Sequence, residues 1–165
     1  MLTNDFDKIS LKRFKIKSIL PDATILILGR RRSGKSFLVR DIFYHHQDIQ
    51  SGVIFSGTEE ASPFFGDFIP DSFIHPEYDP ELIDNILTRQ KRKIRETKAS
   101  GLSDSGKHKS NNLFIVLDDM LHDAQNWKKE KTIKSIFFNG RHYNIFFILT
   151  MQYPLGITPE LRSNI

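Results

Sequence analysis

Short runs of consecutive apolar residues alternate with segments of helical spacing along most of this chain. A run that is apolar at every position predicts a strand buried on both faces, whereas spacing of three or four residues predicts an amphipathic helix. The predicted strands lie at 24–28, 52–56, 113–117 and 145–150, and the predicted helices lie at 36–49, from Pro80 onward and at 132–139. Strands that alternate with helices in this way indicate an α/β fold, a parallel sheet covered by helices.

Several element ends carry signals of their own. Asp79 is a candidate N-cap with Pro80 in the first turn, and Thr158-Pro159-Glu160 begins a further helix. Residues 9–17 alternate loosely, which is typical of an edge strand, and Phe73-Ile74 is a candidate short strand. Residues 99–112 are almost free of apolar side chains and predict a mobile loop. For the helix at 36–49, the residues expected near one face are Leu38, Ile42, His45 and Ile49.

The segment between the first strand and the first helix fits the phosphate-loop pattern G-x-x-x-x-G-K-[ST]. Its glycines let backbone N–H groups turn toward phosphates, and the positive end of the helix dipole favours the same anion. We expect Lys35 to reach the β- and γ-phosphates of ATP and the Ser36 hydroxyl to bind Mg²⁺. The competing interpretation is a glycine-rich turn that binds nothing. The candidate nucleotide-binding residues are Gly29, Arg30, Arg31, Arg32, Ser33, Gly34, Lys35, Ser36 and Phe37.

Two carboxylates follow the apolar run at 113–117, which is the pattern of a Walker B strand. Such a strand brings its last carboxylate to the carboxyl edge of the sheet, where ligands of open α/β sheets bind. We expect Asp118 to hold Mg²⁺ through its water shell and Asp119 to orient or deprotonate an attacking water. Many hydrolases of this class carry Glu at the second position, and Asp is shorter by one methylene. The alternative is a polar strand end that enters a loop.

Gln152 lies just after the strand predicted at 145–150. Its amide is a candidate sensor of both the γ-phosphate and the attacking water, and the alternative is a turn-capping amide before Tyr153-Pro154. A strand that ends in such a sensor, between the phosphate-loop strand and the Walker B strand, is typical of ATP-hydrolysing motors. Kinases and GTPases generally place those two strands side by side. The paired aspartates and Gln152 therefore favour water as the phosphate acceptor.

Composition excludes several other classes of protein. The chain has 165 residues, the length of one domain, and its 39% of hydrophobic residues suffice for a packed core. Cysteine is absent, which excludes disulfides and cysteine-ligated metal sites and fits a reducing compartment. Charges occur throughout residues 1–20, so no signal peptide is expected, and no apolar stretch approaches the ~18 residues of a membrane span.

Five segments together resemble the poxvirus-type genome-packaging ATPases of the HerA–FtsK superfamily, which occur in large DNA viruses and their smaller relatives. The similarity covers residues 22–165 and implies a RecA-like P-loop NTPase domain there, with residues 1–21 as an N-terminal extension or edge strand. Besides the phosphate loop, the segments are Ile115-Val116-Leu117-Asp118-Asp119-Met120, Asn139-Gly140-Arg141-His142-Tyr143-Asn144-Ile145, Thr150-Met151-Gln152-Tyr153-Pro154 and Pro159-Glu160-Leu161-Arg162-Ser163-Asn164-Ile165.

The resemblance also implies partners. It implies a ring of identical subunits, hexameric or pentameric, with ATP at the interfaces and double-stranded DNA moved into a preformed capsid. A capsid or portal protein is the expected docking partner, and the expected location is the host cytoplasm, a viral factory or the virion. The family's next strand, after Asn164-Ile165, is absent from the sequence, so we expect the domain to be truncated at its C-terminal end.

A ring ATPase needs a cation that reaches the γ-phosphate from a neighbouring subunit. Arg141 and Arg162 are the candidates, and Arg162 is favoured because it lies beyond the sensor strand, nearer the carboxyl edge. Each could instead form a surface salt bridge. One arginine of the phosphate loop could act within its own subunit, and the sequence does not distinguish among the three.

The net charge of +4 is a mild bias toward polyanions, and most of it is concentrated in one stretch. The stretch contains Arg89, Lys91, Arg92, Lys93, Arg95 and Lys98. We expect these side chains either to contact DNA phosphates or to form a solvated helix face. Three functions therefore remain open: a DNA translocase, which leads; a phosphotransferase such as a nucleotide kinase; and a nucleotide switch without hydrolysis.

Overall fold

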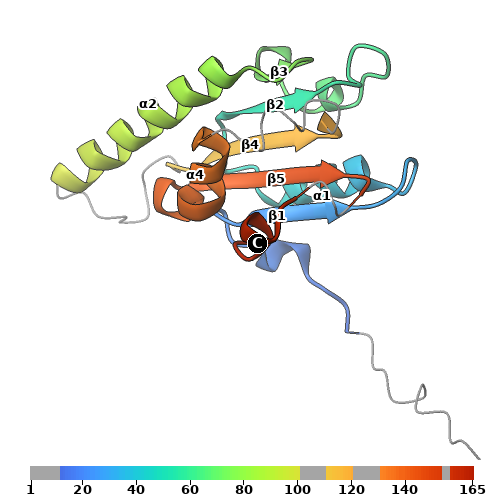
Figure 1. The fold of residues 1–165 in the computed structure, drawn as a ribbon, viewed down its shortest axis with the longest axis horizontal. Helices are drawn as coiled ribbons and strands as arrows, with labels where there is room; N and C mark the ends of the chain where they lie inside the picture. The colour runs from blue at the N-terminus through green and yellow to red at the C-terminus, as the bar shows by residue number, and fades with distance from the viewer. Residues whose placement is uncertain (1–11, 101–110, 121–130, 154–156) are drawn as a thin grey trace, which may run out of the picture.

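The sheet defines the architecture of this chain. The structure is a computed structural model that describes residues 12–100, 111–120, 131–153 and 157–165. Within these ranges, five strands form one parallel sheet in the order β1-β5-β4-β2-β3 (Figure 1). The strands are β1 Thr24–Leu28, β2 Gly52–Ser56, β3 Ile74–His75, β4 Leu113–Asp118 and β5 Ile145–Met151. The parallel sheet predicted from the apolar runs is confirmed, and the short strand β3 begins one residue later than predicted.

Strand β5 lies between β1 and β4 in the sheet. All of its residues are buried, and it pairs in parallel with β1 on one side and β4 on the other. Thr150 is opposite Ile27 in the first pairing and opposite Asp118 in the second. The predicted order, in which this strand separates the phosphate-loop strand from the strand with two aspartates, is therefore confirmed.

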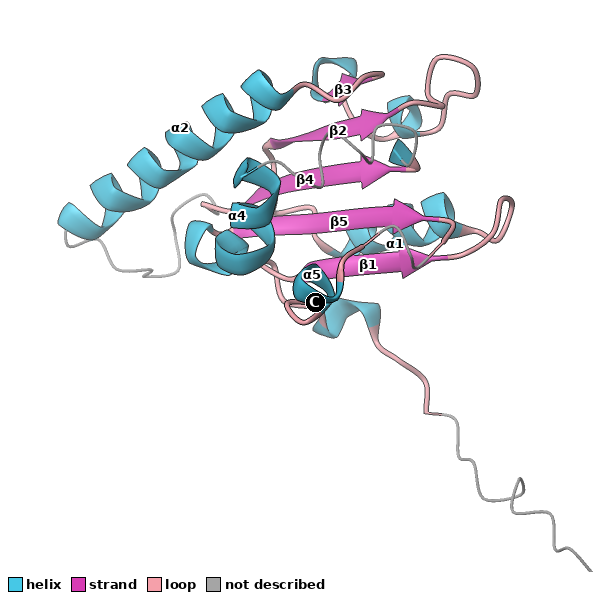
Figure 2. Ribbon diagram, in the orientation of Figure 1, coloured by secondary structure: helices cyan, strands magenta, loops and turns pink. Residues whose placement is uncertain are grey.

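Helix α1, Lys35–His45, covers one face of the sheet and lies behind β1 and β5 in Figure 2. Its buried residues are Val39, Ile42 and Phe43, so the buried face has the i, i+3, i+4 spacing of an amphipathic helix. The prediction placed Leu38 and His45 near the buried face instead, and it was wrong because both are exposed. The helix also ends four residues before the predicted position 49.

The opposite face is covered by α2 Pro80–Ala99, α4 Lys131–Asn139 and α5 Pro159–Arg162. Gln90 of α2 is buried, and its Nε2 donates to the carbonyl oxygens of Asn111 at 2.6 Å and Tyr143 at 2.9 Å. This tie joins α2 to the segments that lead into β4 and β5. Beyond it, α2 runs out past the amino ends of the strands (Figure 1).

Local caps explain where the helices begin. Asp79 Oδ1 accepts from the Leu82 N–H at 3.0 Å, and Thr158 Oγ1 accepts from the Leu161 N–H at 3.4 Å, as the sequence predicts. Short 3₁₀ helices complete the connections. They are η2 Ile16–Ser18, η3 Phe65–Asp67, η4 Asp71–Phe73 and η6 Gly140–Tyr143.

Two further predictions concern segments at the limits of the described ranges. The edge strand predicted at 9–17 is not formed by its described part, which contains η2 packed against α1 and no residue of the sheet. Most of the loop predicted at 99–112 lies outside the described residues. Among the helices that are described, none is long and apolar enough to cross a membrane.

Candidate functional site

A cleft of about 1170 Å³ opens at the carboxyl edge of the sheet. Its walls come from three segments: the loop after β1, the segment after β2 and the end of β4. Lys35 and Ser36 thereby meet Asp118 and Asp119 in one cavity, although the two pairs are far apart in the sequence. The cleft thus lies where parallel α/β sheets generally bind their ligands.

The loop between β1 and α1 depends on unusual backbone conformations. Arg32 and Gly34 both lie in the left-handed region, with φ of 60° and 87°. Left-handed residues within a tight loop are the conformation from which anion-binding nests of N–H groups are built. A Cβ atom on Gly29 would meet the Ser33 hydroxyl, so a larger residue at the first glycine would require the Ser33 side chain to turn away. The Lys35 Nζ donates to the Arg30 carbonyl at 3.2 Å, which keeps the ammonium at the loop.

Three buried polar side chains form a row across neighbouring strands at this edge. Ser56 of β2, Asp118 of β4 and Thr150 of β5 are directly in register. The Thr150 Oγ1 donates to Asp118 Oδ1 at 2.6 Å, and the Ser56 Oγ donates to Asp118 Oδ2 at 3.5 Å. Each carboxylate oxygen of Asp118 therefore has a partner on a different strand, and the carboxylate is held from both sides.

The surroundings of Asp118 change the pKa of its carboxyl. Asp118 is only 4% exposed, and this burial raises the pKa of its carboxyl above the usual range. The hydrogen bond from Thr150 opposes the rise in pKa, the neighbouring Asp119 adds to it, and Lys35 opposes it. A buried carboxylate without an adjacent ion pair gains free energy when a cation binds beside it.

Asp119 and Gln152 meet at the end of the same strands. Asp119 has φ 52°, a left-handed conformation that is uncommon for a residue with a Cβ and costs on the order of 1–2 kcal/mol. Its N–H donates to Thr150 Oγ1 at 3.1 Å. The Gln152 Nε2 donates to the Asp119 carboxylate, at 3.0 Å from Oδ1 and 2.8 Å from Oδ2. Strain of this kind persists where surrounding contacts impose it, often at functional sites.

The donors in the cleft suit Mg²⁺ that arrives with a nucleotide. No group of three or more acidic, histidine or cysteine side chains that could hold a metal ion is present among the described residues. Mg²⁺ prefers oxygen ligands and commonly takes one or two from the protein, the others coming from water and substrate phosphates. The Ser36 hydroxyl and the Asp118 carboxylate are oxygen donors of this kind in one cleft, so they fit the predicted ion.

The candidate arginines occupy three different places. Arg31 and Arg32 line the cleft, and Arg30 is exposed beside them. Arg141 is exposed in η6, which leads into β5 and therefore lies at the amino edge, as the sequence predicts. Arg162 is exposed on α5, which packs against α4 and lies beside the amino end of β1 in Figure 2. The expectation that Arg162 lies nearer the carboxyl edge is therefore wrong. Of these two, neither belongs to the described lining of the cleft of its own chain.

Sequence reasoning gave no role to three residues that build this site: Ser56, Thr150 and Glu59. Ser56 and Thr150 were detectable in principle, because each is a polar residue at or near the end of an apolar run. Glu59 carried no signal, yet its Oε1 accepts from the N–H groups of Phe64 at 2.9 Å and Gly66 at 3.0 Å. It thereby fixes the segment after β2 that forms one wall of the cleft.

A phosphate loop between β1 and α1, two carboxylates at the end of β4, and β5 between β1 and β4 define the P-loop ATPase fold. Solved structures share it. EssC (ATPases 2 and 3) from Geobacillus thermodenitrificans is 18% identical with a TM-score of 0.61, over 87% of this chain and 30% of that chain. The genome packaging NTPase B204 from Sulfolobus turreted icosahedral virus 2, in complex with ATP-gammaS, is 17% identical with a TM-score of 0.52, over 88% and 73% of the two chains.

The chain belongs to the Poxvirus A32 protein family, whose model matches residues 11–165. An uncharacterized protein of Acanthamoeba polyphaga mimivirus is 36% identical, over 97% of this chain and 56% of the relative. An uncharacterized protein of Invertebrate iridescent virus 6 is 32% identical, over 98% of this chain and 62% of the relative. The chain therefore spans little more than half the length of these curated relatives. The resemblance inferred from the motifs is confirmed at the level of the family.

Proposed function

We propose that this chain hydrolyses ATP and couples the reaction to movement of double-stranded DNA during the packaging of a viral genome. The observation that carries the proposal is the meeting of the phosphate loop, the Asp118-Asp119 pair and Gln152 at one edge of the sheet. Membership of the Poxvirus A32 protein family supports the packaging role. The position of β5 between β1 and β4 supports hydrolysis over phosphate transfer to a second nucleotide.

In the proposed reaction, a water oxygen attacks the γ-phosphorus, and the bond to the β–γ bridging oxygen breaks to give ADP and phosphate. Lys35 and the loop N–H groups hold the phosphates, and Asp119 orients the water or accepts its proton. Gln152 already contacts Asp119, so its amide is placed to reach both the water and the γ-phosphate. Mg²⁺ held by Ser36 and Asp118 would neutralise the charge that develops on the phosphates.

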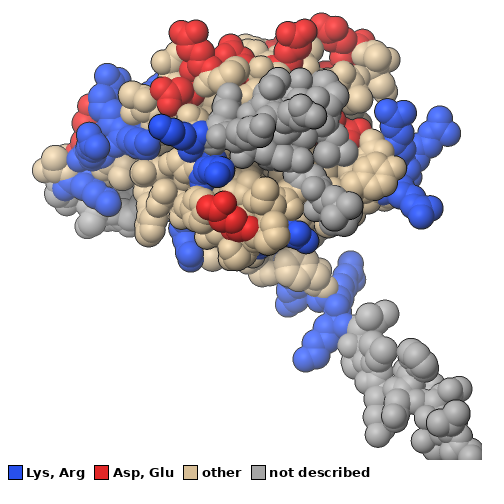
Figure 3. Space-filling view, viewed as in Figure 1, with Lys and Arg blue, Asp and Glu red and all other residues tan. Residues whose placement is uncertain are grey.

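DNA contact is proposed for the basic stretch of α2. Basic side chains gather at three places in Figure 3: along α2, at the loop after β1 and along the segment that precedes β1. Arg89, Arg95 and Lys98 are exposed on α2. Arg92 is exposed too, but it pairs with Glu96 at 3.6 Å within the same helix. Arg89, Arg95 and Lys98 are therefore the stronger candidates for phosphate contacts.

The proposed assembly is a ring of identical subunits that docks on a capsid or portal protein. In such a ring, Arg162, or else Arg141, would reach the γ-phosphate held by a neighbouring subunit. Both side chains are exposed, so each is accessible to a neighbouring subunit.

The test is steady-state ATP hydrolysis with and without long double-stranded DNA, with Asp119→Asn as the blank. Stimulation by DNA that disappears in the blank is the expected result. Phosphate transfer to an added nucleoside monophosphate would support a phosphotransferase instead. ATP binding without turnover, in the presence and absence of DNA, would contradict the proposal in favour of a nucleotide switch.

A further inference from the structure

We propose that Phe37, Phe64 and Arg40 form a stacking platform for the base of the bound nucleotide. The proposal rests on the proposed ATPase function, because it assigns the part of the nucleotide that the phosphate loop does not hold. It defines the preferred ligand as a purine nucleoside triphosphate and predicts which bases the site accepts.

The platform begins directly beside the phosphate loop. Phe37 follows Ser36 in the chain and lines the same cleft as Lys35, so a nucleotide held by its phosphates would have its nucleoside within reach. Despite being a large apolar side chain, Phe37 is 56% exposed. Covering exposed aromatic surface with a base contributes about 1–3 kcal/mol in stacking sites. An open ring at this point of a ligand cleft is therefore a candidate base site.

Phe37 rests on a wall that the fold keeps in place. The Phe64 ring meets it at a centroid distance of 5.2 Å in an edge-on geometry. Phe64 itself packs against Phe65 at 5.5 Å and Phe68 at 5.7 Å, and its N–H is held by Glu59. The wall exists without a ligand, so little ordering would be required when the base binds.

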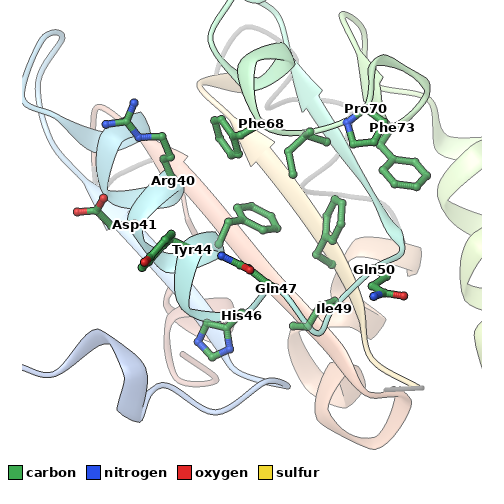
Figure 4. A pocket seen from close by; sticks show the side chains of 13 residues that line it. Arg40, Asp41, Tyr44, His46, Gln47, Ile49, Gln50, Phe68, Pro70 and Phe73 are labelled. Carbon is green, nitrogen blue, oxygen red and sulfur yellow. The ribbon is translucent and has the colours of Figure 1, made fainter. Parts of the chain in front are cut away.

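Arg40 completes the platform from the next turn of α1. Its guanidinium carbon lies 4.8 Å from the ring centroid of Phe37 and 5.7 Å from that of Phe64. Figure 4 shows that the Arg40 side chain also lines a second pocket, of about 550 Å³, on the outer side of α1, at the opposite end from His46. A guanidinium above an aromatic ring is attracted to the ring face and restrains its position, and it can itself stack on a base.

The composition of the platform predicts what it recognises. Stacking depends on ring area and tolerates different bases, because every base has a π face. Purines should therefore bind more tightly than pyrimidines, whereas ATP and GTP should differ by less than about threefold. A site built on hydrogen bonds to the base edge would instead discriminate strongly between ATP and GTP.

The experiment compares two ligands by isothermal titration of the full chain with Mg²⁺ present. ATP carries the base, and inorganic tripolyphosphate carries the phosphates alone. Phe37→Ala should weaken ATP binding about 10-fold, the equivalent of about 1.4 kcal/mol, and leave tripolyphosphate binding unchanged. Phe37→Trp should retain ATP binding. Tyr44→Ala, which removes an exposed aromatic ring from the same helix, is the matched control and should bind both ligands normally.

Other results would overturn the proposal. Unchanged ATP affinity in Phe37→Ala would show that no base stacks there. Equal weakening of ATP and tripolyphosphate would show that Phe37 supports the loop or a contact with another copy of the chain. Phe37→Leu repeats the comparison with apolar volume retained, in case the alanine variant fails to fold.

Failure of the proposed function has a different signature. In that case the wild type itself would bind neither ligand, and Lys35→Ala would behave like the wild type. A third outcome would reject the platform alone. In that case Lys35→Ala abolishes tripolyphosphate binding, which supports the phosphate site, whereas Phe37→Ala leaves ATP binding unchanged.

Discussion

Thr150 Oγ1 lies 2.6 Å from Asp118 Oδ1, and both side chains are buried on neighbouring strands. The same hydroxyl accepts the N–H of Asp119 at 3.1 Å, so one side chain contacts both acidic residues of the site. Threonine is β-branched and stiff at χ1, which fixes the direction of the hydroxyl. Thr150 therefore positions the two aspartates and is not itself a ligand in the proposed reaction.

Thr150→Val tests this role, because it keeps the shape of the side chain and removes the hydroxyl. The hydrogen bond opposes the rise in the pKa of Asp118, so its loss should raise that pKa further. Protonated Asp118 cannot hold Mg²⁺, so the acidic limb of the pH–rate profile should move to higher pH. We expect turnover to fall about 10- to 100-fold and the Mg²⁺ requirement to increase.

The readouts for Thr150 are ATP turnover across a pH series and across a Mg²⁺ series. Thr150→Ser restores the hydroxyl and should recover most of the activity and the original acidic limb. A valine variant whose only defect is a lower Tm, with an unchanged acidic limb and Mg²⁺ requirement, would contradict the positioning role.

Asp119→Asn should separate ATP binding from hydrolysis. Asparagine retains a side-chain oxygen that can accept from Gln152 but cannot accept the proton of the attacking water. We expect ATP to bind with near-normal affinity and turnover to fall at least about 100-fold, the usual contribution of a general base. Equilibrium binding of ATP and single-turnover phosphate release measure the two effects. Normal hydrolysis in this variant would remove Asp119 from the base role.

Neutralising Arg89, Arg92 and Arg95 with Gln should weaken DNA binding and flatten its salt dependence. Each lost phosphate contact changes the slope of log affinity against log salt by about 0.9, so the slope should drop by about 2–3. Fluorescence anisotropy with duplex DNA over a salt series gives the slope. The matched control neutralises Lys12, Lys15 and Lys17, which are also exposed and lie outside α2. An equal change of slope in both triple variants would show that the α2 residues act only through the net charge of the protein.

His46 should make the fold sensitive to acid. It is 5% exposed, its Nε2 is buried without a described partner, and its ring lies 4.8 Å from that of Phe146. Burial lowers the pKa of His46 below its usual 6.5, with His45 acting in the same direction and Asp48 opposing. A folded pKa below the unfolded one means that stability is complete above pH 6.5 and decreases as pH falls through the folded pKa.

The measurement for His46 is the Tm at neutral pH and at about pH 5, compared with that of His46→Phe. The wild type should lose more of its Tm on acidification than the phenylalanine variant, which has no group to protonate there. His142→Gln, which alters an exposed histidine, should lose as much of its Tm at low pH as the wild type does. Identical losses in all three proteins would exclude His46 as the source.

Gly52→Ala should destabilise the sheet. Gly52 is opposite Phe114 in the β2–β4 pairing, and a Cβ there would collide with the Phe114 carbonyl and ring. Because the obstacle includes backbone, we expect a loss of about 1–3 kcal/mol in the free energy of unfolding, measured by urea denaturation. Gly66→Ala is the control, since its Cβ would meet only side chains at 3.4 Å or more. A stable Gly52→Ala protein would show that β2 and β4 can shift apart.

The strands were predictable because their signal is local. A run such as 145–150 is apolar on both faces, so it is stable only as a strand inside a sheet that is covered on both sides. Strand β5 lies in such a position. The face of α1 was less predictable, because its mixed sequence allows more than one apolar stripe. Packing into the core cluster that also contains Ile27 and Val116 selects Val39 and Phe43. Caps such as Asp79 depend only on neighbouring residues and were predicted correctly.

The site was predictable as motifs but not as a geometry. Spacing alone predicted the loop before α1 and the acidic end of β4. It did not give the register that brings Ser56, Asp118 and Thr150 into one row, because register between strands distant in sequence depends on the whole sheet. Glu59 and Phe64 also lie in a segment whose fold follows from tertiary packing, so no local pattern marks them.

Strand β5 has a mechanical consequence for the molecule. Its seven residues span about 23 Å, and β1 and β4 pair with it on its two sides. A displacement of β5 would therefore have to involve both neighbouring strands. Gln152 follows one end, and at the other end the Tyr143 carbonyl receives Gln90 while the Tyr143 ring lies beneath Lys91. One continuous strand therefore connects Gln152, beside Asp119, with the contacts of helix α2 beyond the amino end of β5.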